Sequence, residues 1–76
     1  MTRDQLISTI DALRIPSSAF SLDGPGGGEC YAIEAEGLGW ITYYSERGQR
    51  SSLRFFPDQS DANADLLMRL RAAFRR

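Results

Sequence analysis

The chain has 76 residues, of which 42% are hydrophobic and 25% charged, and its net charge is −1. This composition is that of a small folded domain rather than a disordered tail, and we expect one domain over residues 1–76. Cys30 is the single cysteine and histidine is absent, which excludes an intramolecular disulfide, the common zinc sites and histidine-dependent catalytic triads. The sequence therefore predicts no metal, no cofactor and no enzymatic activity.

The first predicted element is an amphipathic helix over residues 3–14. Thr2 and Gln5 have the spacing of a capping box, apolar residues recur at helical intervals, and Pro16 ends the segment. The segment has no apolar run of signal-peptide length, and nothing approaches the ~20 residues of a membrane span. We therefore expect a cytoplasmic protein without a membrane partner.

Two extended segments are predicted next. Residues 17–22 form a short extended piece that ends in a glycine-rich loop over 23–28. Residues 29–36 alternate as a strand, and Glu34 and Glu36 lie on its wetter face. The glycine-rich loop lacks the Lys-Ser/Thr of a phosphate-binding loop, so we expect no small-molecule ligand there.

A hairpin over residues 40–56 is the most informative part of the chain. A turn at 36–39 leads into a strand over 40–45, and the segment 45–48, Ser-Glu-Arg-Gly, predicts a type I turn closed by a glycine. The last strand covers 49–56, and its alternation places Leu53 and Phe55 toward the core. Glu46 and Arg47 are then expected at the tip of the hairpin.

A second amphipathic helix is predicted over residues 60–74, capped by Asp58 or Ser60. The expected fold class is α+β, an antiparallel three- to four-stranded meander flanked by an N-terminal and a C-terminal helix, in the order α-β-β-β-β-α. Both helices are expected on one face of the sheet, which leaves the other face wet. The predicted core residues are Leu6, Ile10, Leu13, Ile33, Leu53, Phe55, Leu66, Leu70 and Phe74.

Large side chains on both faces of the hairpin indicate a partner protein, since a small core needs only one of the two faces. Trp, Tyr and Arg are enriched at protein–protein hot spots. In our hypothesis Glu46 engages basic groups of the partner, Trp40 and Tyr44 act as flat anchors, and Arg47 and Arg54 pair with acids at the rim. The full set of candidate partner-binding residues is Trp40, Tyr43, Tyr44, Glu46, Arg47, Arg50, Arg54, Glu34 and Glu36.

Two alternative functions use the same residues. A nucleic-acid or nucleotide-binding module would use Arg47, Arg50 and Arg54 with the exposed aromatic side chains, although a pI of about 5.2 disfavours nucleic acid. A dimerising domain would bury the wet face of the sheet against a second copy. Cys30 is interpreted as a small packed residue, and the Glu34 and Glu36 carboxylates as solvated acids rather than catalytic groups.

Several motifs together carry a family resemblance. They are the leading amphipathic helix, Ser-Leu-Asp-Gly at 21–24, the acidic strand at 29–36, Gly39-Trp40, the run 43–48, Arg54-Phe55-Phe56 and the closing acidic-capped helix. With them the chain resembles small bacterial immunity proteins encoded beside secreted toxins, in particular those that neutralise NAD-degrading toxins similar to the tuberculosis necrotizing toxin. The resemblance implies a cytosolic inhibitor that blocks the active site of a cognate NAD glycohydrolase toxin in interbacterial competition.

Overall fold

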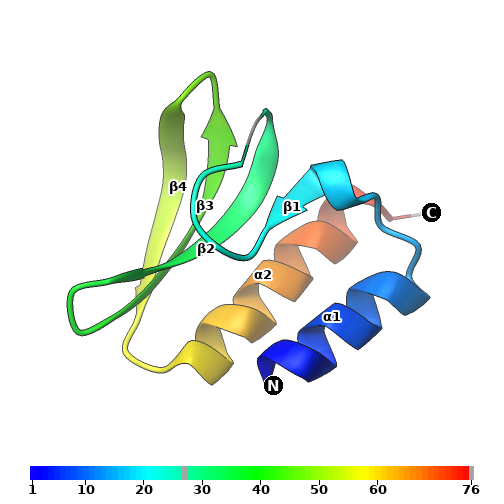
Figure 1. Ribbon diagram of the computed structural model, residues 1–76, viewed down its shortest axis with the longest axis horizontal. Coiled ribbons are helices and arrows are strands. Elements are labelled where there is room, and N and C mark those ends of the chain that lie inside the picture. Colours follow the sequence, from blue (N-terminus) through cyan, green and yellow to red (C-terminus); the bar gives the residue numbers. More distant parts are fainter. Residues whose placement is uncertain (27, 76) are drawn as a thin grey trace.

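The computed structural model describes residues 1–26 and 28–75, and it confirms the predicted order of helix, four strands and helix (Figure 1). The elements are α1 Arg3–Ala12, the 3-10 turn η1 Ser17–Ala19, β1 Phe20–Ser21, β2 Cys30–Glu36, β3 Gly39–Glu46, β4 Gln49–Phe56 and α2 Gln59–Ala73. The α+β fold class is thus as expected. Within the described residues, no helix is both long and apolar enough to cross a membrane.

The sheet has the strand order β1-β2-β3-β4. β2 pairs antiparallel with β3, and β3 with β4, but β1 runs parallel to β2 with Phe20 opposite Tyr31. The prediction of a purely antiparallel sheet is therefore wrong. A parallel connection normally needs about a dozen residues or more, because the chain must run back along the whole length of the first strand. Since β1 is only two residues long, the shorter connection between β1 and β2 is sufficient.

The predicted caps form at the N-termini of both helices. The Thr2 hydroxyl accepts from the backbone N–H of Gln5 while the Gln5 side chain accepts from the N–H of Thr2, which completes the capping box of α1. The Asp58 carboxylate accepts from the N–H of Ser60 at the start of α2. Each cap satisfies donors that have no partner within the helix, and this fixes where each helix begins.

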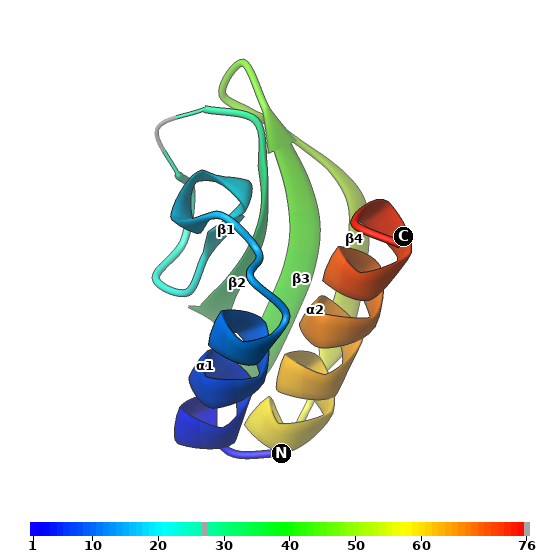
Figure 2. The same ribbon diagram turned by 90° about the vertical axis from the view of Figure 1, so that its right-hand side faces the viewer.

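Both helices lie on one face of the sheet, as predicted (Figure 2). α2 packs against β2, β3 and β4, and α1 packs against α2. Leu6 and Ile10 of α1 meet Leu66 and Leu70 of α2 and Ile33 of β2 in the core, and all five side chains are at most 2% exposed. These five core predictions are confirmed.

Four other core predictions are wrong. Leu13, Leu53, Phe55 and Phe74 are 44%, 51%, 56% and 36% exposed. Leu13 and Phe74 are the C-cap residues of α1 and α2, so they lie where each helix leaves the core. Leu53 and Phe55 are exposed because the alternation of β4 is interrupted.

The interruption is a β-bulge at Ser52. Thr42 pairs with Arg54 and Tyr44 with Ser51, so Ser52 and Leu53 together lie opposite Tyr43. Ser52 has a φ of 55°, in the left-handed region that bulges use. One extra residue reverses which face each later side chain occupies. Arg54 therefore turns toward the helices, and Leu53 and Phe55 turn away from them.

The β3–β4 turn also differs from the prediction. Glu46 pairs with Gln49, which leaves a two-residue loop of Arg47 and Gly48 with φ values of 51° and 78°. Two positive φ values define a type I′ turn, which matches the right-handed twist of a hairpin better than the expected type I turn. Glu46 and Arg47 are exposed at the tip, as predicted.

Candidate protein-binding surface

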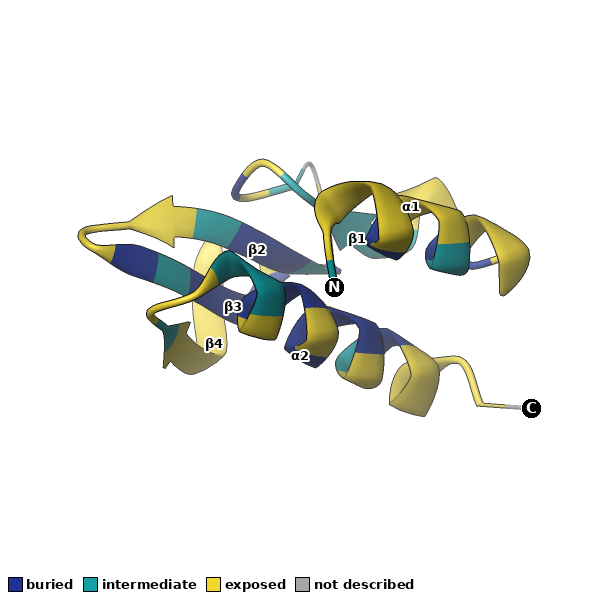
Figure 3. Ribbon diagram, turned by 90° about the horizontal axis from the view of Figure 1, so that it is seen from below, coloured by how far each residue is buried: buried dark blue, intermediate teal, exposed yellow. Residues whose placement is uncertain are grey.

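The sheet face turned away from the helices carries the most distinctive exposed side chains, and we name it the open face. Its residues include Ala32, Glu34 and Glu36 of β2, Ile41 and Tyr43 of β3, and Arg50, Leu53 and Phe55 of β4. Exposure is concentrated on β4, which is exposed along most of its length, whereas β3 beside it is largely buried (Figure 3).

A small apolar cluster of Ala32, Ile41 and Tyr43 forms the floor of the open face, and none of the three is more than 3% exposed. Phe55 pairs with Ile41 across the strands, and its ring also lies over Gly39. A Cβ at position 39 would approach the Phe55 Cζ atom to 2.5 Å, so glycine is required for this contact. Phe55 thus covers the floor with one side of its ring and exposes the other.

A polar cluster adjoins this floor. The Tyr43 hydroxyl donates to Glu34 Oε1 at 2.6 Å, and Arg50 Nη1 lies 3.7 Å from both Glu34 Oε1 and Glu36 Oε1. The Arg50 guanidinium also lies 5.5 Å from the centre of the Tyr43 ring. Burial, together with the hydrogen bond to Glu34, raises the pKa of Tyr43 well above its usual value, so the phenol keeps its proton.

The polar groups of this cluster are paired with one another. The Glu34 carboxylate is shared by Tyr43 and Arg50, and the thiol of Cys30 is buried. Within residues 1–26 and 28–75, no three Cys, Asp or Glu side chains are grouped closely enough to hold a metal ion. Since the polar groups are already paired with each other, the apolar side chains of Leu53 and Phe55 are the groups with most to gain from contact with a partner.

The hypothesis assigned the contacts to the hairpin tip and the wet face of the sheet, but the candidate residues divide among three places. Glu34, Glu36, Tyr43 and Arg50 lie on the open face, whereas Glu46 and Arg47 lie at the hairpin tip. Tyr43 is itself 0% exposed, so it lies beneath the surface of the open face and cannot contact a partner directly.

Trp40, Tyr44 and Arg54 lie on the helix side of the sheet. Trp40 packs against the main core, and the Tyr44 ring contacts the Tyr31 ring in a tilted arrangement, with centroids 4.9 Å apart and the ring planes at 59°. Because side chains alternate along β3, both of them lie on the face of the sheet opposite to the face of Tyr43. They are half-buried, which leaves little of either ring for a partner.

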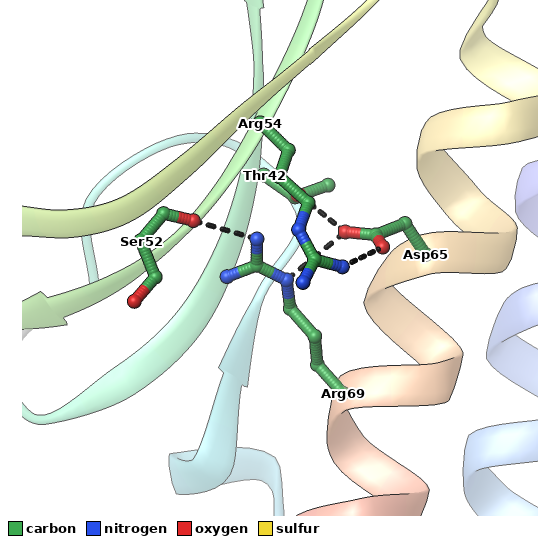
Figure 4. Close-up of polar contacts among 5 residues, drawn as sticks. All are labelled: Thr42, Ser52, Arg54, Asp65 and Arg69. Carbon is green, nitrogen blue, oxygen red and sulfur yellow. Dashed lines mark hydrogen bonds and ion pairs between the residues drawn. The ribbon is translucent and has the colours of Figure 1, made fainter.

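Arg54 belongs to a buried polar network that the sequence prediction missed (Figure 4). Asp65 of α2 accepts from Thr42 Oγ1 at 2.6 Å, from Arg54 Nη1 at 2.7 Å and from Arg69 Nε at 2.9 Å. Arg69 Nη2 also donates to the backbone carbonyl of Ser52 at 2.6 Å. The network therefore joins α2 directly to the β4 bulge.

Asp65 is the centre of this network, and its side chain is 6% exposed. Burial acts to raise the pKa of Asp65, but the hydrogen bonds from Thr42 and Arg54 and the charge of Arg69 outweigh it, so the pKa lies below its ordinary value. The sequence contained one signal for this site. Asp65 and Arg69 are oppositely charged and four residues apart on α2. Each directly precedes a leucine of the apolar stripe, Leu66 and Leu70.

No protein-family model, no curated protein and no solved structure matches this chain.

Proposed function

We propose that this protein is a non-catalytic inhibitor that binds a cognate protein through the open face of its sheet. The partner class that the motifs favour is a secreted antibacterial toxin that degrades NAD, which makes the chain an immunity protein. Inhibition of this kind needs only that the bound protein occupies the active site of the toxin or its entrance. A stable complex of this type covers about 800 Å² on each partner.

One observation carries the proposal. Leu53 and Phe55 are 51% and 56% exposed beside polar groups that are paired with one another. Half-exposed apolar side chains beside polar groups that already have hydrogen-bond or ion-pair partners are typical of interaction surfaces, because a partner can bury them without leaving a polar group unpaired. The Asp65 network supports the bulge that turns both side chains outward.

The charges of the open face fit a basic cleft. Two carboxylates, Glu34 and Glu36, face a single arginine, Arg50, so this part of the surface has an excess of one negative charge. Toxins that bind a dinucleotide need basic groups for its phosphates. An acidic, partly apolar surface is complementary to such a cleft, and the complementarity favours fast and specific association.

The placement of the arginines disfavours the nucleic-acid alternative. Arg50 pairs with acids on the open face, while Arg54 pairs with Asp65 on the helix side. Arg47 lies at the hairpin tip. These three arginines therefore do not form one continuous basic surface of the kind that phosphate backbones require.

The experiment is recovery of the partner, followed by an inhibition assay. The tagged chain is used to isolate its partner from the organism that encodes it, and the recovered protein is tested for NAD hydrolysis with and without added chain. We expect hydrolysis that the wild-type chain suppresses and that a Leu53→Ala/Phe55→Ala variant fails to suppress.

Ile7→Ala is the matched control, because Ile7 is 43% exposed, comparable to Leu53, but lies on α1, away from the open face. This variant should suppress hydrolysis as well as the wild type. A partner without NAD-degrading activity would refute the toxin class. Full suppression by the double variant would refute the open face as the inhibitory surface. If the chain recovers no partner but forms dimers, and the double variant is monomeric, the dimerisation alternative would be supported.

A further inference from the structure

A second surface lies on the helix side of the molecule and is independent of the open face. A groove of about 800 Å³ runs beside α1 and α2, and no strand residue lines it. Its apolar lining includes Leu13, Met68 and Phe74, which are 44%, 56% and 36% exposed. These side chains are not buried in the core. They line the groove from the ends and the outer side of the two helices.

The charged side chains that line the groove are all arginines: Arg14, Arg71 and Arg75. Within residues 1–26 and 28–75, none of the three makes an ion pair or a side-chain hydrogen bond, and no carboxylate is among the lining residues. The C-cap residues of both helices, Leu13 and Phe74, line the groove, and each helix end contributes only about −0.5 charge. Since three positive charges exceed that amount, the groove is basic although the chain as a whole is acidic.

Arg14 occupies a backbone position that favours glycine. Its φ is 57°, its N–H donates to the carbonyl of Asp11 at 3.0 Å, and the N–H of Ile15 donates to the carbonyl of Ile10 at 3.3 Å. This is a Schellman motif, whose left-handed residue is most often glycine because other side chains are strained there. An arginine at this position places a third positive charge beside the groove at the expense of backbone strain.

We propose that this groove binds an acidic amphipathic helix of a partner protein. The apolar side chains of that helix would lie between α1 and α2 on Leu13, Met68 and Phe74, and its flanking carboxylates would pair with Arg14, Arg71 and Arg75. A helix that lies in an apolar groove formed by two other helices is a common recognition mode, with anchors at spacings of three and four residues. The two helices run side by side in the same direction (Figure 2), and residues from both line the groove.

The shape and charge of the groove favour this occupant over two others. A second copy of the chain could insert only two helices: α1, whose exposed large apolar residue outside the groove is Ile7, or α2, whose exposed apolar residues already line the groove. A membrane surface is also a poor fit, because helices that insert into lipid present a protruding rather than a hollow apolar face.

The test is selection from displayed helices of about 14 residues, roughly 21 Å long, against the folded wild-type chain. Each helix carries apolar residues at helical spacing, and its flanking positions vary among Glu, Gln and Lys. We expect Glu to be enriched over Lys by about tenfold or more at these positions. Failure to enrich any helix, or equal recovery of Glu and Lys, overturns the proposal.

The enriched helix is then labelled and titrated by fluorescence polarisation. Met68→Glu and Arg71→Glu/Arg75→Glu should each weaken binding by about tenfold or more, whereas Phe55→Glu on the open face should leave it unchanged. Unchanged binding in Met68→Glu overturns the groove as the site. So does a dimer in sedimentation that Met68→Glu dissociates, or binding of the chain to anionic vesicles through the same residues.

Arg14→Gly separates a binding role from a structural one. Glycine suits a φ of 57°, so the melting temperature of this variant should be no lower than that of the wild type. Its affinity for the selected helix should nevertheless fall several-fold, because one of the three arginines is lost. An unchanged affinity would overturn the assignment of Arg14 to the site.

Discussion

Removal of the Asp65 charge should destabilise the protein more than removal of any surface carboxylate. In Asp65→Asn, the Arg69 side chain, which is 8% exposed, loses its partner carboxylate and remains buried. Breaking a buried ion pair by removing one partner costs about 3–5 kcal/mol. The Arg54 side chain is 55% exposed, so its ion pair adds little to this value. We therefore expect a loss of about 3 kcal/mol, from a total of roughly 4–11 kcal/mol for a chain of this length.

The assay is urea denaturation followed by the fluorescence of Trp40, the single tryptophan, which packs against the core. Asp23→Asn is the control, because Asp23 forms an ion pair with Arg3 at 3.2 Å but is 82% exposed. This control should lose at most about 1 kcal/mol. A loss in Asp65→Asn no larger than in Asp23→Asn would refute the role of the network.

The effect should also depend on pH with a definite sign. The folded-state pKa of Asp65 is lowered from its ordinary value of 3.8, so its contribution to stability is present above that value and is lost as the pH falls through the folded-state pKa. The difference between wild type and Asp65→Asn should therefore be constant near neutral pH and shrink below about pH 4. A difference that stays constant into strong acid would contradict this account of the charge.

Three further predictions concern the core, the open face and catalysis. Leu70→Ala should lower the free energy of unfolding by about 2–5 kcal/mol, because Leu70 is 0% exposed between α2 and the sheet, and an unchanged denaturation curve would show that α2 does not pack as described. Tyr43→Phe should cost about 0.5–1.5 kcal/mol through loss of the hydrogen bond to Glu34, and stability equal to wild type would count against that bond. The purified protein should not consume NAD, since it has no histidine and its one thiol is buried; hydrolysis that disappears on replacing Glu34 or Glu36 would overturn the inhibitor proposal.

The sequence predicted most of the architecture because the signals for it were local. The capping box at Thr2 and Gln5, the cap at Asp58 and the apolar spacing of both helices are contained within a few residues of each element. The alternation of residues 29–36 and 40–45 likewise assigned the strands correctly. The parallel pairing of β1 was not predictable in this way, because it depends on where the loop over 22–29 returns the chain.

The binding surface was harder to predict because it depends on one non-local feature. Strict alternation along 49–56 assigns Leu53 and Phe55 to the core, and the bulge at Ser52 reverses that assignment. The bulge is itself held by Arg69 from α2, a residue far along the chain. The pattern within one strand does not show that contact, so the prediction placed the exposed face on the wrong side of β4 after Ser52.

The predicted anchors Trp40 and Tyr44 lie on the helix side of the sheet for a similar reason. Trp40 and Tyr44 have the composition of a hot spot, but they alternate with Tyr43, and the helices cover their side of the sheet. Which side the helices cover is set by the packing of α2 on β2, β3 and β4 rather than by β3 alone. Glu34, Glu36 and Arg50 were assigned to the open face correctly, since they precede the bulge or lie on another strand.

The affinity of the purified partner for open-face variants tests the central claim most directly. Phe55 is 56% exposed, which corresponds to about 100 Å² of surface available for burial, or about 2.5 kcal/mol at ~25 cal/mol per Å². Titration calorimetry should therefore give a Kd about 70-fold weaker for Phe55→Ala and weaker still for Leu53→Ala/Phe55→Ala, with Ile7→Ala equal to wild type. A Kd that is unchanged in both open-face variants, while their denaturation curves show an intact fold, would contradict the account.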